Sequence, residues 1–291
     1  MFTGYKSILV PMSDAASAVP ALESALRMAS DFSSHVIGLH VRPDPTAAVP
    51  LMGEGMSGAM VEEMLSAAEK QAAERAAAAR RAFDEICARH GVPLVASPPA
   101  AGLSAEWIDV TGREEELVAW RGRLSDLVAM VRPENGAEVP SLMTLNAALM
   151  ESGRPLLLAP PELPATMGTR VAIAWNGSAE SGRAVAAAMP FLQKAGHGVV
   201  ILSIAEDDRT ANVPAGELAA YLAWHDVKAE CRVLTGAAAH TGEVLLAECR
   251  SQGADLLVMG AYTHSRLRQL ILGGVTRHVL HHADVCCLLS H

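Results

Sequence analysis

Residues 254–291 read ADLLVMGAYTHSRLRQLILGGVTRHVLHHADVCCLLSH. The segment begins with an apolar run, passes through a stretch with glycines at 260, 273 and 274, and continues as a helical pattern before a second apolar run. Short apolar runs joined through a helical segment are typical of buried parallel strands with a crossover helix. The segment therefore predicts one strand–loop–helix–strand unit of an α/β domain.

The same alternation of strand and helix patterns occupies both halves of the chain, which predicts parallel strands covered by helices on both faces. The five pairs of matching runs are YKSILVPMSD (5–14) with TRVAIAWNGS (169–178), HVIGLHV (35–41) with GVVILSI (198–204), AEWIDVTG (105–112) with AECRVLTG (229–236), SDLVAMV (125–131) with ADLLVMG (254–260), and GRPLLLAP (153–160) with DVCCLLS (284–290). Five strands that recur in one order indicate a duplicated domain.

The seam between the copies is expected in PPELPATMG, residues 160–168, because three prolines and a glycine interrupt strand and helix alike. We therefore expect a first lobe at 1–163 and a second lobe at 168–291. The first lobe has a longer second helix with a stripe of small and apolar residues, which we interpret as core packing rather than a recognition face. The stripe consists of Val61, Leu65, Ala68, Ala72, Ala76, Ala79, Phe83 and Ile86.

Length, charge and cysteine content narrow the class of protein. A chain of 291 residues is long enough for two domains, and its formal net charge of −9 without a basic run argues against nucleic acid as a main partner. No secretion signal and no apolar stretch of about 20 residues is evident, so we expect neither export nor a membrane. An odd number of cysteines in apolar surroundings fits reduced thiols and a cytoplasmic location. They are Cys87, Cys231, Cys249, Cys286 and Cys287.

The glycines of the opening segment are suited to binding phosphate. Gly260 ends a strand, and Gly273 and Gly274 come just before a helix. Glycine allows the backbone to approach a ligand, and a helix N-terminus offers N–H groups to an anion. The spacing matches neither the Walker loop nor the G-x-G-x-x-G fingerprint. From these residues alone, a phosphate site and an ordinary strand–loop–helix turn are equally supported.

The same stretch resembles the G-x2-G-x9-G-[ST] signature of the universal stress protein family, and the whole chain resembles its tandem members. The resemblance implies an α/β fold of two tandem five-stranded parallel sheets, Rossmann-like and similar to the adenine nucleotide alpha hydrolases. Many members of the family bind ATP, with adenine near the first strand and phosphates on the glycine loop. It thus implies ATP or AMP with Mg²⁺ as the cofactor, and an adenine nucleotide or a smaller phosphate as the partner.

Carried over by position, the four signature residues fall on Gly260, Thr263, Gly273 and Gly274, so the second and fourth depart from the pattern. A β-branched Thr263 is costly at a positive φ, and its Cβ would crowd a phosphate. Gly274 lacks a hydroxyl, which Thr276 would supply instead. We therefore expect a nucleotide-shaped pocket with weakened triphosphate affinity.

The remaining site residues surround that loop. The family's adenine-side aspartate appears as Asn176, and the apolar residue after the second strand falls at Ile204. Asn176 retains an acceptor oxygen and adds a donor. Val275 adds a backbone N–H at the helix start, and His264 either contacts phosphate or is a solvated loop residue.

The first lobe departs further from the signature. Ser13 stands at the aspartate position, Val131 replaces the first glycine, and the carboxylates of Glu134 and Glu138 would repel a polyphosphate. We interpret this lobe as one that does not bind nucleotide.

Other functions are weaker alternatives. His278, His281, His282, Cys286 and Cys287 resemble zinc ligands, but neighbouring cysteines on a strand point to opposite faces, so at most one can join. No nucleophile elbow is present, so we do not expect a dedicated enzyme. We expect a stress-response protein that acts in ligand-dependent signalling or protection, with an interaction scaffold or a slow ATPase as alternatives. In the family the final strands pair across a two-fold axis, so a pseudo-dimer within the chain and a homodimer both stay open.

Overall fold

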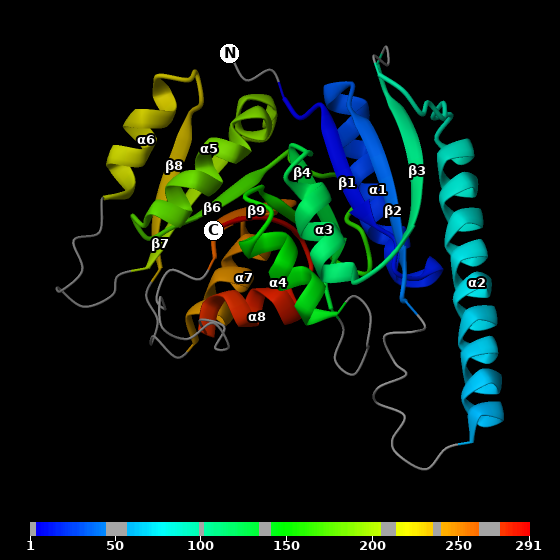
Figure 1. Ribbon diagram of the computed structural model, residues 1–291. Helices are drawn as coiled ribbons and strands as arrows, with labels where there is room; N and C mark the ends of the chain where they lie inside the picture. The colour runs from blue at the N-terminus through cyan, green and yellow to red at the C-terminus, as the bar shows by residue number, and fades with distance from the viewer. Residues whose placement is uncertain are drawn as a thin grey trace.

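The computed structural model describes residues 4–44, 57–98, 102–133, 141–204, 214–234, 240–261 and 274–291 (Figure 1). The elements of the first lobe are β1 (Ser7–Pro11), α1 (Ala15–Phe32), β2 (His35–Arg42), α2 (Gly58–Arg89), β3 (Ser104–Thr111), α3 (Glu114–Gly122), β4 (Leu127–Val131), α4 (Leu142–Met150) and β5 (Leu156–Ala159). Those of the second lobe are β6 (Val171–Trp175), α5 (Ala179–Lys194), β7 (Val199–Ile204), α6 (Ala215–Ala223), β8 (Ala229–Leu234), α7 (Thr241–Ser251), β9 (Leu256–Gly260), α8 (Gly274–His282) and β10 (Cys286–Ser290). The α/β fold expected from the alternation is therefore confirmed.

The described strands form one continuous sheet in the order β3-β2-β1-β4-β5-β10-β9-β6-β7-β8. Within each lobe the neighbouring strands are parallel, and the order reverses beside the first strand of the lobe, between β1 and β4 and between β6 and β9. The lobes meet at β5 and β10, which pair antiparallel with Leu157 opposite Leu288. The final strands of the two copies thus pair inside one chain.

The two copies share a carboxylate contact that joins the fourth strand to the first. The Asp126 carboxylate, just before β4, accepts hydrogen bonds from the backbone N–H groups of Lys6 (2.7 Å) and Ser7 (3.1 Å). Asp255, just before β9, accepts the corresponding bonds from Thr169 (3.2 Å) and Arg170 (3.0 Å). In each lobe, the aspartate just before the fourth strand therefore holds the backbone at the start of the first strand.

Apolar side chains fill both sides of the sheet. One face packs against α1, α2, α5 and α6. The other face packs against α3, α4, α7 and α8. Cys286 belongs to the first face and Cys287 to the second, so the prediction that these neighbours point apart is confirmed. No described helix is long and apolar enough to cross a membrane.

Aromatic packing ties the lobes together on the first of these faces. The Tyr5 hydroxyl donates to the carbonyl of Ala187 (2.5 Å), and its ring lies 5.8 Å from Phe32 and 5.9 Å from Phe191, centre to centre. Burial raises the Tyr5 pKa far above its ordinary value, with Asp126 adding to the effect. The two lobes therefore share a core as well as a sheet.

The buried residues of the long helix α2 lie between Ala72 and Cys87. Ala72, Ala79, Phe83 and Ile86 are buried, as the core interpretation predicts. Ala68 is exposed, and the earlier turns project beyond the sheet (Figure 1). The core interpretation is therefore wrong for Ala68, whereas Val61 and Leu65 are half-buried.

Candidate functional site

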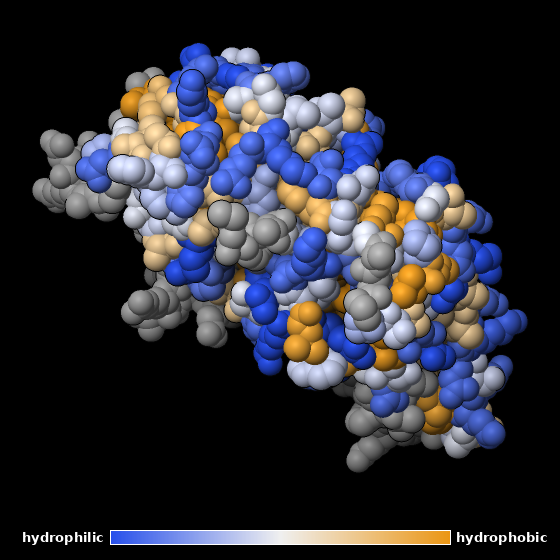
Figure 2. Space-filling view, turned by 90° about the horizontal axis from the view of Figure 1, so that it is seen from above, coloured by the Kyte–Doolittle hydropathy of each residue, from blue (hydrophilic) through white to orange (hydrophobic). Residues whose placement is uncertain are grey.

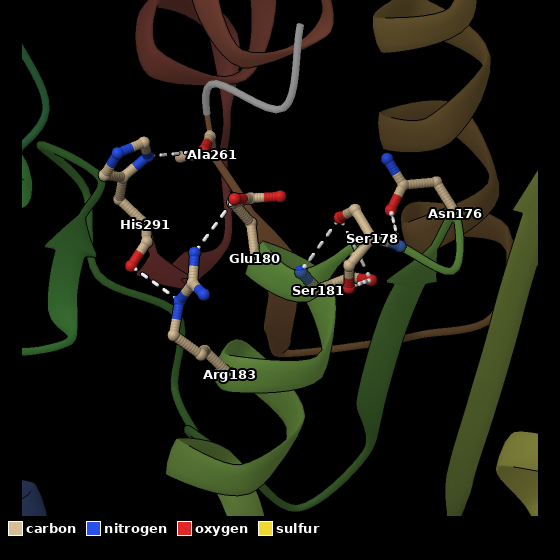
Figure 3. Close-up of polar contacts among 7 residues, drawn as sticks. All are labelled: Asn176, Ser178, Glu180, Ser181, Arg183, Ala261 and His291. Atoms are coloured by element: carbon tan, nitrogen blue, oxygen red, sulfur yellow. Dashed lines mark hydrogen bonds and ion pairs between the residues drawn. The ribbon is translucent and has the colours of Figure 1, made fainter. Parts of the chain in front are cut away.

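The candidate site lies at the carboxyl edge of the second lobe, where β6, β7 and β9 end. Helix α5 begins directly after β6, and its N-terminal turn lies beside the end of β9 (Figure 3). This is the reversal point of strand order in the lobe, and open α/β sheets bind ligands at that point. The helix N-terminus adds a partial positive charge.

The turn between β6 and α5 is built by the sequence NGS. The Asn176 Oδ1 accepts a hydrogen bond from the Ser178 N–H (3.1 Å), and the Ser178 Oγ accepts one from the Ser181 N–H (3.1 Å), which caps the helix. Gly177 between them has a φ of +73°, a conformation that favours glycine. The Asn176 oxygen is used by the turn. The amide nitrogen of this exposed residue therefore points away from the turn (Figure 3).

Gly260 lies against the first turn of α5. A Cβ at this position would be 2.5 Å from the Ser181 nitrogen and 2.7 Å from the Glu180 carbonyl carbon, both of them backbone atoms. The absence of a side chain at Gly260 is therefore required by helix packing, independently of a ligand. Sequence reasoning did not anticipate this contact, because α5 lies about 80 residues away along the chain.

An ion-pair network crosses the edge between α5 and β10 (Figure 3). The Arg183 guanidinium donates to the Glu180 Oε1 (2.9 Å) and to the backbone oxygen of His291 (2.8 Å). The His291 Nδ1 lies 3.2 Å from the Ala261 carbonyl. Burial alone would raise the Glu180 pKa, but a hydrogen bond to its own backbone N–H, Arg183 and His291 together lower it. The site edge thus carries an ionised carboxylate beside Gly260.

Helix α8 contributes the last part of the site. A Cβ at Gly274 would meet nothing within 4 Å, so the helix begins in open space among the described residues. Val275 is half-buried, and Thr276 is only 6% exposed. A ligand at this N-terminus is therefore offered backbone N–H groups more readily than the Thr276 hydroxyl.

Several expected site residues are not described. Thr263, His264 and Gly273 lie outside the described residues, so their predicted roles stay predictions. Ile204 is the last residue of β7, but its side chain is not described. Of the nine expected site residues, the structure brings Asn176 and Gly260 to the two sides of the α5 N-terminus.

The histidines of α8 form a stacked pair. The rings of His278 and His282 lie 4.4 Å apart, at 18° to each other. Burial lowers the pKa of His278, with His282 contributing, and burial together with Arg277 lowers that of His281. Within the described ranges, no three His, Cys, Asp or Glu side chains are placed to hold a metal ion.

In the first lobe, a carboxylate of the protein bridges the corresponding edge. Glu114, at the start of α3, accepts hydrogen bonds from the hydroxyls of Ser13 and Thr144, the latter at 3.2 Å. Ile8 pairs with Leu127 of β4 as Val171 pairs with Leu256 of β9, and counted from these pairs Ser13 stands where Asn176 stands in the second lobe. Thr144 in α4 matches Thr276 in α8 by position in the helix.

The carboxylates that sequence analysis selected for this lobe were different. Glu134 and Glu138 lie outside the described residues, whereas Glu114 was missed. The only sequence signal for Glu114 is the acidic run EEE at 114–116, and such a run is common in the first turn of a helix. The bridge from Ser13 to Thr144 places a negative charge at the edge where a nucleotide would bind.

Comparisons with known proteins support one family. The profile of the Universal stress protein family matches residues 4–119 and 167–291. A universal stress protein from Archaeoglobus fulgidus DSM 4304 is similar in structure, with a TM-score of 0.66 and 16% identity over 98% of this chain and 97% of that chain. A putative universal stress protein from Pseudomonas aeruginosa UCBPP-PA14 has a TM-score of 0.58 and 15% identity over 99% and 94%. These structures show the fold, and no curated protein matches significantly in sequence.

Proposed function

The chain belongs to the universal stress protein family, and on this premise we propose that its second lobe binds an adenine nucleotide. We further propose that occupancy of this site serves stress signalling or protection rather than turnover. The ligand would lie across the carboxyl edge of β6, β7 and β9. Its adenine or ribose would contact Asn176, and its phosphate would lie near the N–H groups that begin α8.

The observation that carries this proposal is the exposed Asn176 amide beside the α5 N-terminus, at the point where the strand order of the lobe reverses. The turn occupies the Asn176 oxygen (3.1 Å from the Ser178 nitrogen), which leaves the amide N–H groups as donors for adenine nitrogens or a ribose hydroxyl. An aspartate would instead offer only acceptors at neutral pH. At this position the second lobe would thus recognise the nucleotide by donating hydrogen bonds from the Asn176 amide.

The ionised Glu180 favours a ligand with few phosphates. Its carboxylate lies at the same edge, beside Gly260, and is only 19% exposed. Arg183 offsets part of the Glu180 charge, since its guanidinium lies 2.9 Å from Oε1. Each added phosphate still brings further negative charge toward the carboxylate, and incomplete solvent screening preserves the remaining repulsion. We therefore propose that AMP binds more tightly than ATP, and that Mg²⁺ would arrive with the phosphates of ATP.

Isothermal titration of the full chain with AMP, and with ATP in Mg²⁺, tests the proposal. AMP is expected to bind more tightly than MgATP, and Asn176→Ala should weaken AMP binding about tenfold through the loss of one hydrogen bond. Ser13→Ala is the matched control, because it alters the equivalent position of the first lobe. It should leave AMP affinity unchanged.

Two outcomes would contradict the proposal. Titration without heat for either nucleotide up to about millimolar concentration, together with a co-purifying protein, would favour the scaffold. Mg²⁺-dependent phosphate release from ATP, lost on mutating Gly273 and Gly274, would instead favour the slow ATPase.

A further inference from the structure

The strand β8 forms an open end of the sheet. No described strand lies beyond it. Glu230, Cys231, Arg232 and Val233 are all exposed, the apolar Val233 to 65%. A strand of this kind presents unpaired backbone donors and acceptors to another chain.

The opposite end of the sheet is covered where β3 begins. The outer edge of β3 receives the segment 93–95: the Val95 N–H donates to the Ala105 carbonyl (2.8 Å), and the Ala105 N–H donates to the Pro93 carbonyl (2.9 Å). Phe83 of α2 packs against Trp107 of β3, with ring centres 5.3 Å apart. In the second lobe the corresponding helix, α6, has only 9 residues. The two lobes thus differ in how far the described residues protect their end strand.

The residues of β8 are complementary to a second copy of themselves. In an antiparallel pair with its two-fold axis at Cys231, Glu230 lies opposite Arg232 of the second copy, and Arg232 lies opposite Glu230 of that copy. Ala229 lies opposite Val233 in the same arrangement. Opposite charges face each other twice and apolar residues face each other twice, and directly opposed side chains contact across antiparallel strands.

Other registers are not complementary. With the axis at Glu230 or at Arg232, one of these charges faces its own copy. With the axis midway between 231 and 232, Glu230 faces Val233 and Cys231 faces Arg232. With the axis midway between 230 and 231, Glu230 faces Cys231 and Ala229 faces Arg232. Charge and polarity therefore select a single register, and a sheet register is specified by such pairing.

We propose that two copies of this chain associate through β8, antiparallel, with the two-fold axis at Cys231. The molecule already joins two parallel sheets in this way, because β5 of the first lobe and β10 of the second pair antiparallel where the lobes meet. The left end of the surface in Figure 2, where α6 and β8 lie in Figure 1, shows apolar residues among charged ones. Trp224, which follows α6, is 88% exposed. Exposed aromatic residues of this kind are enriched at interfaces.

Sedimentation velocity of the full chain under reducing conditions tests the proposed dimer. The wild-type chain of 30.5 kDa should form a concentration-dependent species of twice that mass. Arg232→Glu places like charges opposite each other twice and should raise the dimer dissociation constant about tenfold or more. The double variant Glu230→Arg with Arg232→Glu restores opposite charges and should return it to within about threefold of the wild type. Arg75→Glu, an equal change of charge on the exposed surface of α2, is the matched control and should have no effect.

A short bis-maleimide gives a second measurement, because Cys231 is exposed and the other four cysteines are buried. Covalent dimer should form in the wild type, fall strongly in Arg232→Glu and disappear in Cys231→Ser. A wild-type chain that stays monomeric up to about millimolar concentration would overturn the proposal. An equal dissociation constant in Arg232→Glu and Arg75→Glu, or a double variant no tighter than Arg232→Glu, would also overturn it.

Discussion

Replacing Gly260 by alanine tests the packing of α5 against β9. The new methyl carbon would lie 2.5 Å from the Ser181 nitrogen and 2.7 Å from the Glu180 carbonyl carbon. Reaching an ordinary contact of 3.4 Å requires a movement of about 0.9 Å between two backbone segments. No change of rotamer relieves this contact, because both atoms belong to the main chain of a helix.

The expected cost follows from that geometry. Overpacking of a close-packed interior costs about 1–3 kcal/mol, and contact with backbone places Gly260→Ala at the upper end, about 3 kcal/mol. Gly182→Ala is the matched control on the same helix, because a Cβ there meets nothing within 4 Å. It should stabilise the protein by about 0.5–1 kcal/mol, since alanine is the better helix former.

Urea unfolding followed by far-ultraviolet circular dichroism separates the two variants. With a slope of about 3 kcal/mol/M for a chain of this size, Gly260→Ala should lower the midpoint by about 1 M. Gly182→Ala should raise the midpoint by about 0.2–0.3 M. If Gly260→Ala unfolds at the wild-type midpoint, the first turn of α5 does not lie against the end of β9 and the described site geometry is wrong.

Three further results are expected. Glu180→Gln removes a charge at the site edge and should tighten binding of ATP by several-fold more than that of AMP in titration calorimetry, whereas equal changes for both would contradict the proposed repulsion. Glu114→Ala removes the acceptor shared by Ser13 and Thr144 and should lower the free energy of unfolding by about 1–2 kcal/mol, whereas Glu116→Ala on the exposed side of α3 should change it by less than about 0.5 kcal/mol. Burial lowers the pKa of His278 and His281, so the unfolded chain binds more protons near pH 6; the free energy of unfolding should fall as pH decreases through about 6.5 in urea titrations. An equally steep fall in a variant with glutamine at both histidines would show that other groups cause it.

The fold was accessible from the sequence because its signals are local and repeated. The apolar run LLVM at 256–259 became a buried strand, and the match of SD at 125–126 to AD at 254–255 marked a contact that both lobes make. The proline-rich seam at 160–168 ends where the second segment that matches the family profile begins, at residue 167. The division at 1–163 and 168–291 stays a prediction.

The site was less accessible because its decisive contacts join residues far apart in the chain. Glu114 meets Ser13 across 101 positions, and Gly260 meets Ser181 across the whole of α6, α7 and the strands between them. The glycine pattern identified Gly260 but not the reason for it, since spacing cannot distinguish a ligand from a packed helix. Thr276 has the helix position that the pattern predicts, and burial reduces its access to a ligand.

The most direct test of the proposed function is photoaffinity labelling of the full chain with 8-azido-AMP, followed by peptide mapping. The label should fall on peptides from residues 168–291, near the β6–α5 turn or the start of α8, and excess AMP should prevent it. The first lobe should stay unlabelled, because Glu114 bridges its edge. Labelling of residues 1–163 to the same extent, or labelling that excess AMP leaves unchanged, would contradict an adenine nucleotide site in the second lobe.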